Sequence, residues 1–315
     1  MRSDAVPCQT MVMGSQFWWF YDVLAVAAVA IMMFLSGRRG IFKSLLQVTG
    51  YFLAFVIAFS VSGSVSRGFY KNSVRNSNVK KVAKSVASVD FIAEVTDYIE
   101  EEFGFSGEIE YGRMEKIYTE KNSLGLDYDE QVYQYVSRIY IDKITNENAF
   151  CRKLHEGYGE IVNGIVSENL IAYAGETAAA EIVDNPETMN ELIPLLLDPE
   201  GSQEAAEYIT DTYIGTPYKK MIRLVSFMAV LVLLVAVTVF LVNTTFKTAG
   251  FQSIGSHIGG ALTGILPGLV IVVFIAACVR LNVICGEDKM LFFNNGAIEK
   301  TYIFKHIYSF ITSNF

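Results

Sequence analysis

The stretch SGRRGIFK, residues 36–43, joins two of the most apolar segments of this 315-residue chain. The segment before it, residues 17–35, reads FWWFYDVLAVAAVAIMMFL, and residues 44–66 after it contain no charged side chain. Three basic residues and two glycines therefore lie between two apolar runs. Such a stretch is either a buried charged strip or a turn at a membrane surface, and the lengths of the neighbouring segments decide between these.

Four charge-free windows rich in apolar residues occur in the chain, at 23–37, 44–66, 224–246 and 248–279. A helix needs about 20 apolar residues to cross the hydrocarbon core of a bilayer. The second and third windows reach this length, the fourth exceeds it, and the first reaches it only as Phe17–Gly37, with Asp22 inside. Buried core helices of a soluble protein are the alternative. Four helices with so little amphipathicity favour a polytopic membrane protein instead. The basic stretch is then a surface turn, in which Gly37 and Gly40 let the backbone reverse between two antiparallel spans.

A long polar segment separates the second window from the third. Residues 64–220 hold 28 acidic and 15 basic side chains, a net charge of −13, whereas the rest of the chain carries +5. This acidity argues against nucleic acid or anionic lipid as a partner of the segment. Its apolar residues recur at helical spacing, and those along residues 79–103 predict a single helix, so we expect a compact helical domain. Residues 107–111 are the only weak strand candidate.

The sequence therefore predicts an all-α protein, a four-helix transmembrane bundle with an inserted extracytoplasmic α-helical domain. The expected parts are the N-terminal segment with the first two spans, the acidic helical domain, the last two spans, and an amphipathic C-terminal tail. Their predicted bounds are 1–66, 67–220, 221–281 and 282–315.

No residue pattern is typical of a catalytic, cofactor or metal site, so we expect a protein that is not an enzyme and has no cofactor. The acidic clusters at 100–102 and 127–130 lack the turn glycine of a calcium loop, and we expect them to form a solvated face. The three histidines lie in separate segments, which disfavours a zinc site. A disulfide is possible among Cys8, Cys151 and Cys285, which share one side of the predicted membrane, although separate thiols are favoured.

Two features inside the predicted spans are candidates for a role beyond crossing the bilayer. Asp22 is an intramembrane acid by position, which makes it a functional candidate. The alternative is an interfacial carboxylate, stabilised by the dipole of a helix N-terminus. Gly260, Gly264 and Gly268 recur every four residues and predict a face of span four that packs closely on another span, with span two or three expected. Pro267 should kink this helix.

The order of these features resembles the colicin V production protein family. The resemblance begins with the acid in span one, Asp22, and continues through the turn Gly37-Arg-Arg-Gly40-Ile-Phe-Lys43 into a second span. It resumes at Leu224 and runs through the glycine-rich residues 253–268 to the amphipathic tail at 295–308, so that it covers roughly half of the chain. The acidic segment is far larger than in short members, and Thr263 stands where many members have a basic residue.

The resemblance implies a non-enzymatic protein of the bacterial cytoplasmic membrane, needed for toxin production or export and for envelope homeostasis. The acidic segment and both termini would lie outside the cell. The cytoplasmic face would hold Lys247 and the turn residues Gly37, Arg38, Arg39, Gly40 and Lys43.

The partners implied are membrane lipid and an envelope or export protein, with a homo-oligomer as an option and no nucleic acid. A small channel or transporter subunit is one alternative function. A membrane sensor whose outer domain binds a ligand is another.

Overall fold

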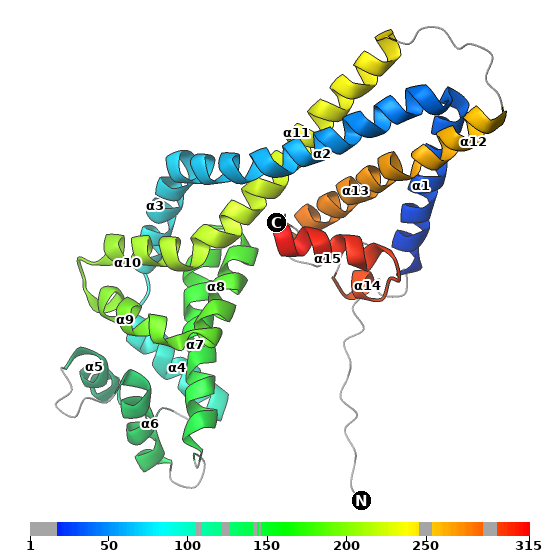
Figure 1. Cartoon of the computed structure of the whole chain (residues 1–315). Helices are drawn as coiled ribbons and strands as arrows, with labels where there is room; N and C mark the ends of the chain where they lie inside the picture. The colour runs from blue at the N-terminus through cyan, green and yellow to red at the C-terminus, as the bar shows by residue number, and fades with distance from the viewer. Residues whose placement is uncertain are drawn as a thin grey trace, which may run out of the picture. The chain divides into compact units, whose positions relative to one another are not determined.

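The structure is a computed structural model, and it describes residues 18–104, 107, 109–120, 127–140, 144, 146–245, 254–285 and 295–315. Within these ranges the regular elements are helices and no strand occurs, which confirms the prediction of an all-α protein. The chain divides into two compact units (Figure 1). The apolar unit comprises the chain up to Gly68 together with Lys220–Phe315, and the acidic unit comprises Phe69–Lys219.

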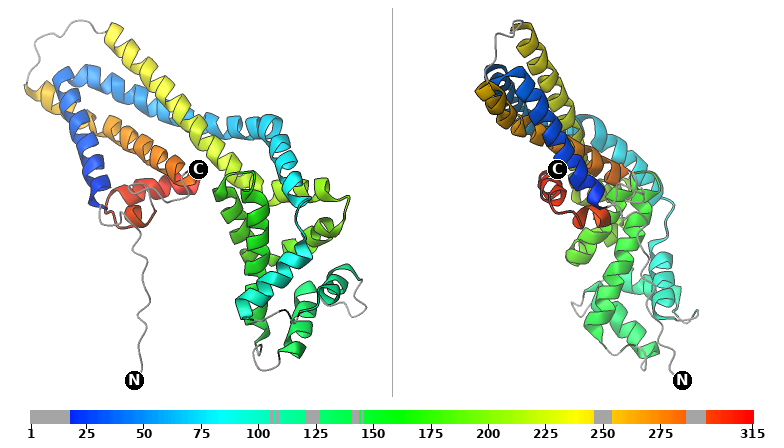
Figure 2. Two further views of the ribbon diagram at one scale, coloured as in Figure 1. Left: turned by 180° about the vertical axis from the view of Figure 1, so that it is seen from behind. Right: turned by 90° about the vertical axis from the view of Figure 1, so that its right-hand side faces the viewer.

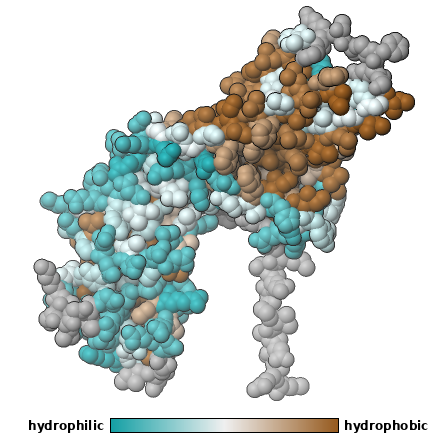
Figure 3. Space-filling view, viewed as in Figure 1, coloured by the Kyte–Doolittle hydropathy of each residue, from teal (hydrophilic) through white to brown (hydrophobic). Residues whose placement is uncertain are grey.

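The helices of the apolar unit are α1 (Trp19–Arg39), α2 (Ile41–Phe69), most of α11 (Gly215–Thr245), α12 (Ile254–Thr263), α13 (Ile265–Cys285), α14 (Asn295–Glu299) and α15 (Phe304–Asn314). Four helical stretches, which begin at Trp19, Ile41, Ser202 and Ile254, are long and apolar enough to cross a membrane. They expose large apolar side chains such as Phe42, and Figure 3 shows this apolar surface in brown. An apolar surface of this kind suits lipid rather than water.

The fourth predicted span consists of two helices that meet at Gly264. Pro267 lies in the first turn of α13 and has no N–H to donate to the carbonyl of Thr263. At the end of α12, the Gly264 N–H bonds the carbonyl three residues before it, that of Ala261, at 3.0 Å. This tighter turn closes α12. The disturbance expected from the proline is therefore a break one turn before it, rather than a kink within one helix.

Packing in the apolar unit centres on α1 and α15. α12 and α13 lie along α1, and α15 packs on α13 and on the start of α1 (Figure 2). α2 contacts α11 through the Phe55 and Phe227 rings, whose centroids are 5.7 Å apart. The end of α15 joins this contact, because the Phe315 ring lies 4.9 Å from that of Phe227. The guanidinium of Arg223 lies 5.1 Å from the Phe315 ring centroid, a cation–π contact.

The α-helices of the acidic unit are α3 (Arg75–Val86), α4 (Phe91–Phe103), α5 (Tyr111–Thr119), α6 (Tyr128–Ile139), α7 (Glu147–Ser167), α8 (Ala172–Asp184), α9 (Met189–Leu197) and α10 (Ser202–Ile209), with a short 3₁₀ turn η3 (Pro186–Thr188) before α9. α7 is central and packs against α3, α4, α6 and α8. Asp90, Asp127 and Asn146 cap α4, α6 and α7 by accepting backbone N–H bonds.

Two details of the acidic unit differ from the sequence prediction. The periodic residues 79–103 form two helices, because the chain turns after Val86 and Asp90 caps a new helix at Phe91. The strand candidate at 107–111 is wrong where the structure describes it, because Ile109 and Glu110 are irregular and α5 begins at Tyr111.

The acidic unit also contains two π-helical turns, η2 (Tyr70–Val74) and η4 (Thr210–Ile214), which a hydrogen bond between Tyr70 and Thr210 connects. Arg75 binds Asp211 with two hydrogen bonds of 2.7 and 2.6 Å, and the Tyr70 hydroxyl donates to the Thr210 carbonyl at 3.4 Å. These contacts join the two turns, because each connects a residue in or next to η2 with a residue of η4.

Candidate functional site

The carboxylate of Asp22 binds the start of the tail helix α15. One oxygen accepts the N–H groups of Ile303 and Phe304, both at 2.9 Å, and the other accepts the Tyr302 N–H at 2.7 Å. The Thr301 hydroxyl accepts the next N–H, that of Lys305, at 2.8 Å. The backbone donors that a helix N-terminus leaves unpaired are thus satisfied, and a negative charge lies at the positive end of the helix dipole. Asp22 therefore caps a helix other than its own.

Aromatic side chains surround this cap. The Tyr21 ring stacks on Phe304 with centroids 4.9 Å apart, and Trp18 meets Tyr302 edge to face at 5.5 Å. Phe304 is fully buried. The first turn of α1 and the first turn of α15 are therefore joined by both polar and apolar contacts.

The basic turn after α1 is closed by a glycine and covered by α12. Gly40 has φ +80°, a conformation that favours glycine, and its N–H bonds the Gly37 carbonyl at 3.4 Å. From α12, the His257 ring nitrogen Nδ1 lies 2.8 Å from that same carbonyl, and the Ser256 hydroxyl accepts the Ile41 N–H at 3.2 Å. These contacts hold the turn between α1 and α2.

The basic side chains of this turn make different contacts. The Arg38 guanidinium lies 5.7 Å from the Phe34 ring, and Arg39 donates to Gln47, which in turn donates to the Tyr51 hydroxyl at 3.0 Å. We expected the turn to reverse the chain so that the second span ran back along the first. Figures 1 and 2 instead show α1 and α2 diverging from it, and α12 with α13 take the place beside α1. Lys247 lies outside the described residues.

Gly260, Gly264 and Gly268 face α1, not span two or three as expected. A Cβ atom on Gly264 would lie 2.5 Å from the Met33 Cα, and one on Gly268 would lie 2.7 Å from the Val29 Cα. A Cβ on Gly260 would lie 2.8 Å from a carbonyl oxygen of α1. α1 is suited to this approach because it also offers a small residue at the contact, Gly37, which lies against Ala261.

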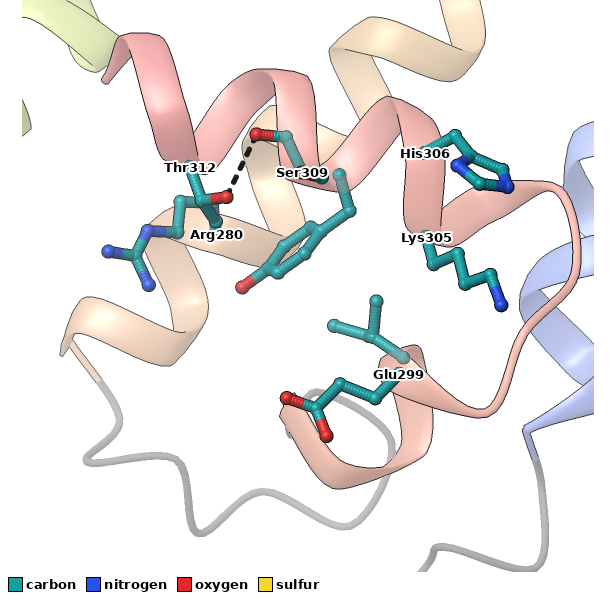
Figure 4. A pocket seen from close by; sticks show the side chains of 8 residues that line it. Arg280, Glu299, Lys305, His306, Ser309 and Thr312 are labelled. Atoms are coloured by element: carbon teal, nitrogen blue, oxygen red, sulfur yellow. Dashed lines mark hydrogen bonds between the residues drawn. The ribbon is translucent and has the colours of Figure 1, made fainter.

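A polar pocket of about 540 Å³ opens between the end of α13, α14 and α15 (Figure 4). Its lining residues are Arg280, Ile298, Glu299, Lys305, His306, Tyr308, Ser309 and Thr312. In Figure 4, Arg280 lies on one side of the pocket and Lys305 and His306 on the other, with Glu299 between them. Sequence reasoning missed this group. The available signal was a basic residue that ends the fourth charge-free window and two more in the tail.

The acidic unit contains a hydrogen-bonded chain of four side chains. Asp129 lies 2.6 Å from His155 Nε2 and accepts the Tyr158 hydroxyl at 3.2 Å, while the hydroxyls of Tyr158 and Tyr118 are 2.9 Å apart. Cys151 lies one turn before His155 on α7, but burial and the charge of Asp129 raise the pKa of its thiol to about 12. Such a thiol is a poor nucleophile, so Cys151 and His155 lack the features of a Cys–His catalytic pair. The hydrogen-bonded side chains instead link α5, α6 and α7.

The acidic clusters are used in part for structure. Glu100 accepts the N–H groups of Gly107 and Ile109, both at 3.1 Å, and Asp127 caps α6. In the part of the chain that the structure describes, no group of three or more His, Cys, Asp or Glu side chains is placed to hold a metal ion. The described cysteines, Cys151, Cys278 and Cys285, are unpaired; Cys8 lies outside the described residues.

Comparison with known proteins identified no relative, because the chain matches no protein-family model, no curated protein and no solved structure.

Proposed function

We propose that this chain is a multi-pass protein of the bacterial cytoplasmic membrane, of the colicin V production type. It acts without enzymatic activity in toxin production or export and in envelope homeostasis. The support is the order of the motifs from Asp22 through the basic turn to the glycine-rich fourth span, together with four helices apolar enough to cross a bilayer.

The observation that carries a scaffold role is the use of the polar groups in the apolar unit. Asp22 caps α15, Gln47 bonds both Arg39 and Tyr51, and His257 lies against the Gly37 carbonyl. Polar side chains that serve a transport pathway line a cavity or a pore. These polar groups instead connect helices, which favours a rigid membrane scaffold over a small channel or transporter subunit.

In this proposal the acidic unit lies outside the membrane and docks a protein of the envelope or of an export machinery. Its net negative charge favours a partner with a basic surface. A crosslinkable amino acid placed at exposed positions of the acidic unit, such as Glu94 or Glu120, tests this in intact cells. Mass spectrometry should identify one recurrent envelope protein, and crosslinks only to lipid or to the chain itself would contradict the proposal.

The channel alternative is tested separately with the purified protein in liposomes. We expect the liposomes to retain entrapped ions and small solutes at the rate of protein-free liposomes. Saturable flux that depends on the protein would favour the alternative.

A further inference from the structure

The polar pocket beside α15 lies at the end of the apolar unit where α1 begins. Asp22 in the first turn of α1 binds the backbone of residues 302–304, and Lys305 on the same helix lines the pocket. Two aromatic side chains at this level are strongly exposed, Trp19 at 49% and Tyr302 at 71%. Trp and Tyr favour the headgroup region of a bilayer. The pocket therefore opens where lipid headgroups would surround it.

The orientation of α15 agrees with this location. One face of the helix borders the polar pocket, and the other borders an apolar groove of about 260 Å³ between α1 and α13. Ile303 and Ile307 line the groove, whereas Lys305 and Ser309 line the pocket. A helix with an apolar face toward the spans and a polar face away from them has the arrangement of an interfacial helix.

The pocket has more cationic than anionic groups. Arg280 and Lys305 are basic, His306 can be protonated, and Glu299 is the one carboxylate among the lining residues. Across the described ranges, no carboxylate forms an ion pair within 4 Å of the side-chain nitrogens of Lys305 or His306. Within the described residues, neither side chain is therefore held in an ion pair by a carboxylate.

A hydroxyl completes the donor set. The Thr312 hydroxyl donates to the Ser309 carbonyl at 3.0 Å, as the dashed line in Figure 4 shows, and Ser309 is one of the residues that line the pocket. Phosphate groups are bound by cationic nitrogens together with neutral donors, and arginine is especially suited to them. The pocket combines an arginine, a lysine and a hydroxyl.

We propose that this pocket binds the phosphate group of an anionic phospholipid headgroup, with Arg280 and Lys305 as its cationic contacts and Ser309 as a hydroxyl donor. Glu299 weakens the attraction, which keeps the lipid exchangeable. This binding is independent of the protein partner proposed for the acidic unit.

The test uses the full chain in a neutral detergent, titrated with phosphatidylglycerol, phosphatidylcholine or inorganic phosphate, with binding read from intrinsic fluorescence and from the thermal midpoint. Phosphatidylglycerol should bind and raise the midpoint, and phosphatidylcholine should bind at least tenfold more weakly. Arg280→Gln and Lys305→Gln should each weaken phosphatidylglycerol binding about tenfold, because each loses a charge-assisted contact.

Two further variants keep the test independent of folding defects. Glu299→Gln removes the repulsive carboxylate and should tighten binding several-fold, a gain that misfolding cannot produce. Lys300→Gln is the matched control, because Lys300 is exposed beside the pocket but does not line it, and its binding should match the parent.

The outcomes separate the sources of the phosphate. If inorganic phosphate displaces the lipid at equal concentration, the phosphate chemistry stands and the ligand is a soluble phosphate. If phosphatidylcholine binds as tightly as phosphatidylglycerol, or if the Arg280, Lys305 and Lys300 variants all bind alike, the proposal is overturned.

Discussion

Asp22 receives three backbone hydrogen bonds from a segment that follows it by 280 residues or more. A carboxylate within an apolar, membrane-spanning stretch is costly unless it is paired. Here the pairing is with the N-terminus of α15, where backbone donors and the helix dipole favour a negative charge. The sequence placed Asp22 at a helix start, but nothing in its spacing indicated that the helix was a distant one.

Asp22→Leu should therefore release the tail without disturbing the spans. Hydrogen bonds to a charged group contribute about 1.5–3 kcal/mol, so we expect the backbone amides of residues 302–304 to exchange roughly 30-fold faster. Asp22→Asn keeps an acceptor and should give a smaller increase. Hydrogen exchange with mass spectrometry measures this, with Glu120→Gln as a remote control. Unchanged exchange in Asp22→Leu would mean that the aromatic contacts alone hold α15.

Cys151 gives a prediction about pH. Burial raises the pKa of its thiol from the ordinary 9.0 to about 12. Between these two pKa values the unfolded chain releases the thiol proton, whereas the folded chain keeps it. The free energy of unfolding therefore falls as pH rises through this range. We therefore expect the acidic unit to lose stability between pH 9 and about 12 more steeply in the parent than in Cys151→Ser. Thermal melts across this range check it, and parallel pH profiles would contradict it.

At the scale of elements, the fit between α12, α13 and α1 depends on where glycines meet backbone atoms. A Cβ on Gly264 would meet the Met33 Cα, whereas a Cβ on Gly259 would meet only the end of the Ile41 side chain, at 2.6 Å. A flexible side chain can move, but a packed backbone cannot do so without separating the helices. Gly259 therefore serves as the matched control for substitutions at Gly264.

Gly264→Ala should destabilise the folded protein, while Gly259→Ala should be neutral or stabilising, because alanine favours a helix over glycine by about 1 kcal/mol. Gly264→Leu should be more severe, since overpacking typically costs about 1–3 kcal/mol. Ile271→Leu, nearly equal in volume, should melt like the parent. Thermal melts and yields in detergent measure these effects. A Gly264→Leu protein that accumulates and melts like the parent would disprove close packing on α1.

The elements that the sequence predicted correctly are those set by local composition. A charge-free run of about 20 residues can satisfy its backbone in lipid only as a helix, so the four apolar helices followed from residue types alone. The partner of the glycine stripe did not follow, because a small-residue face shows that two helices approach closely but not which two. Likewise, the apolar spacing continues across the gap between Val86 and Ile92, so periodicity could not show that α3 and α4 are separate.

At the scale of the whole molecule, orientation in the membrane remains a prediction. We expect the acidic unit outside the cell and the basic turn inside, although basic residues such as Arg67 and Lys220 flank the acidic unit as well. Long segments translocate largely regardless of charge, so the short turn should decide. Arg38 is the better labelling position in that turn, because Gly40 has a positive φ that a cysteine would strain.

Labelling with an impermeant maleimide in intact cells checks this orientation. In a background with all four cysteines replaced by serine, Glu110→Cys should react and Arg38→Cys should react only after the cells are opened. Both positions are exposed in the structure, so a lack of reaction reports the membrane barrier rather than burial. Reaction at position 38 alone would invert the orientation.

The bond between α1 and α15 also sets an order of events during synthesis. The carboxylate of Asp22 leaves the ribosome 280 residues before the first backbone donor that it will bind. At about 5–20 residues per second, the first span waits on the order of 15–60 seconds in the membrane for its partner. A chain interrupted before residue 302 never supplies that partner, so its first span keeps an unpaired acid. This unpaired carboxylate would distinguish interrupted chains from complete ones, and a membrane protease can recognise it.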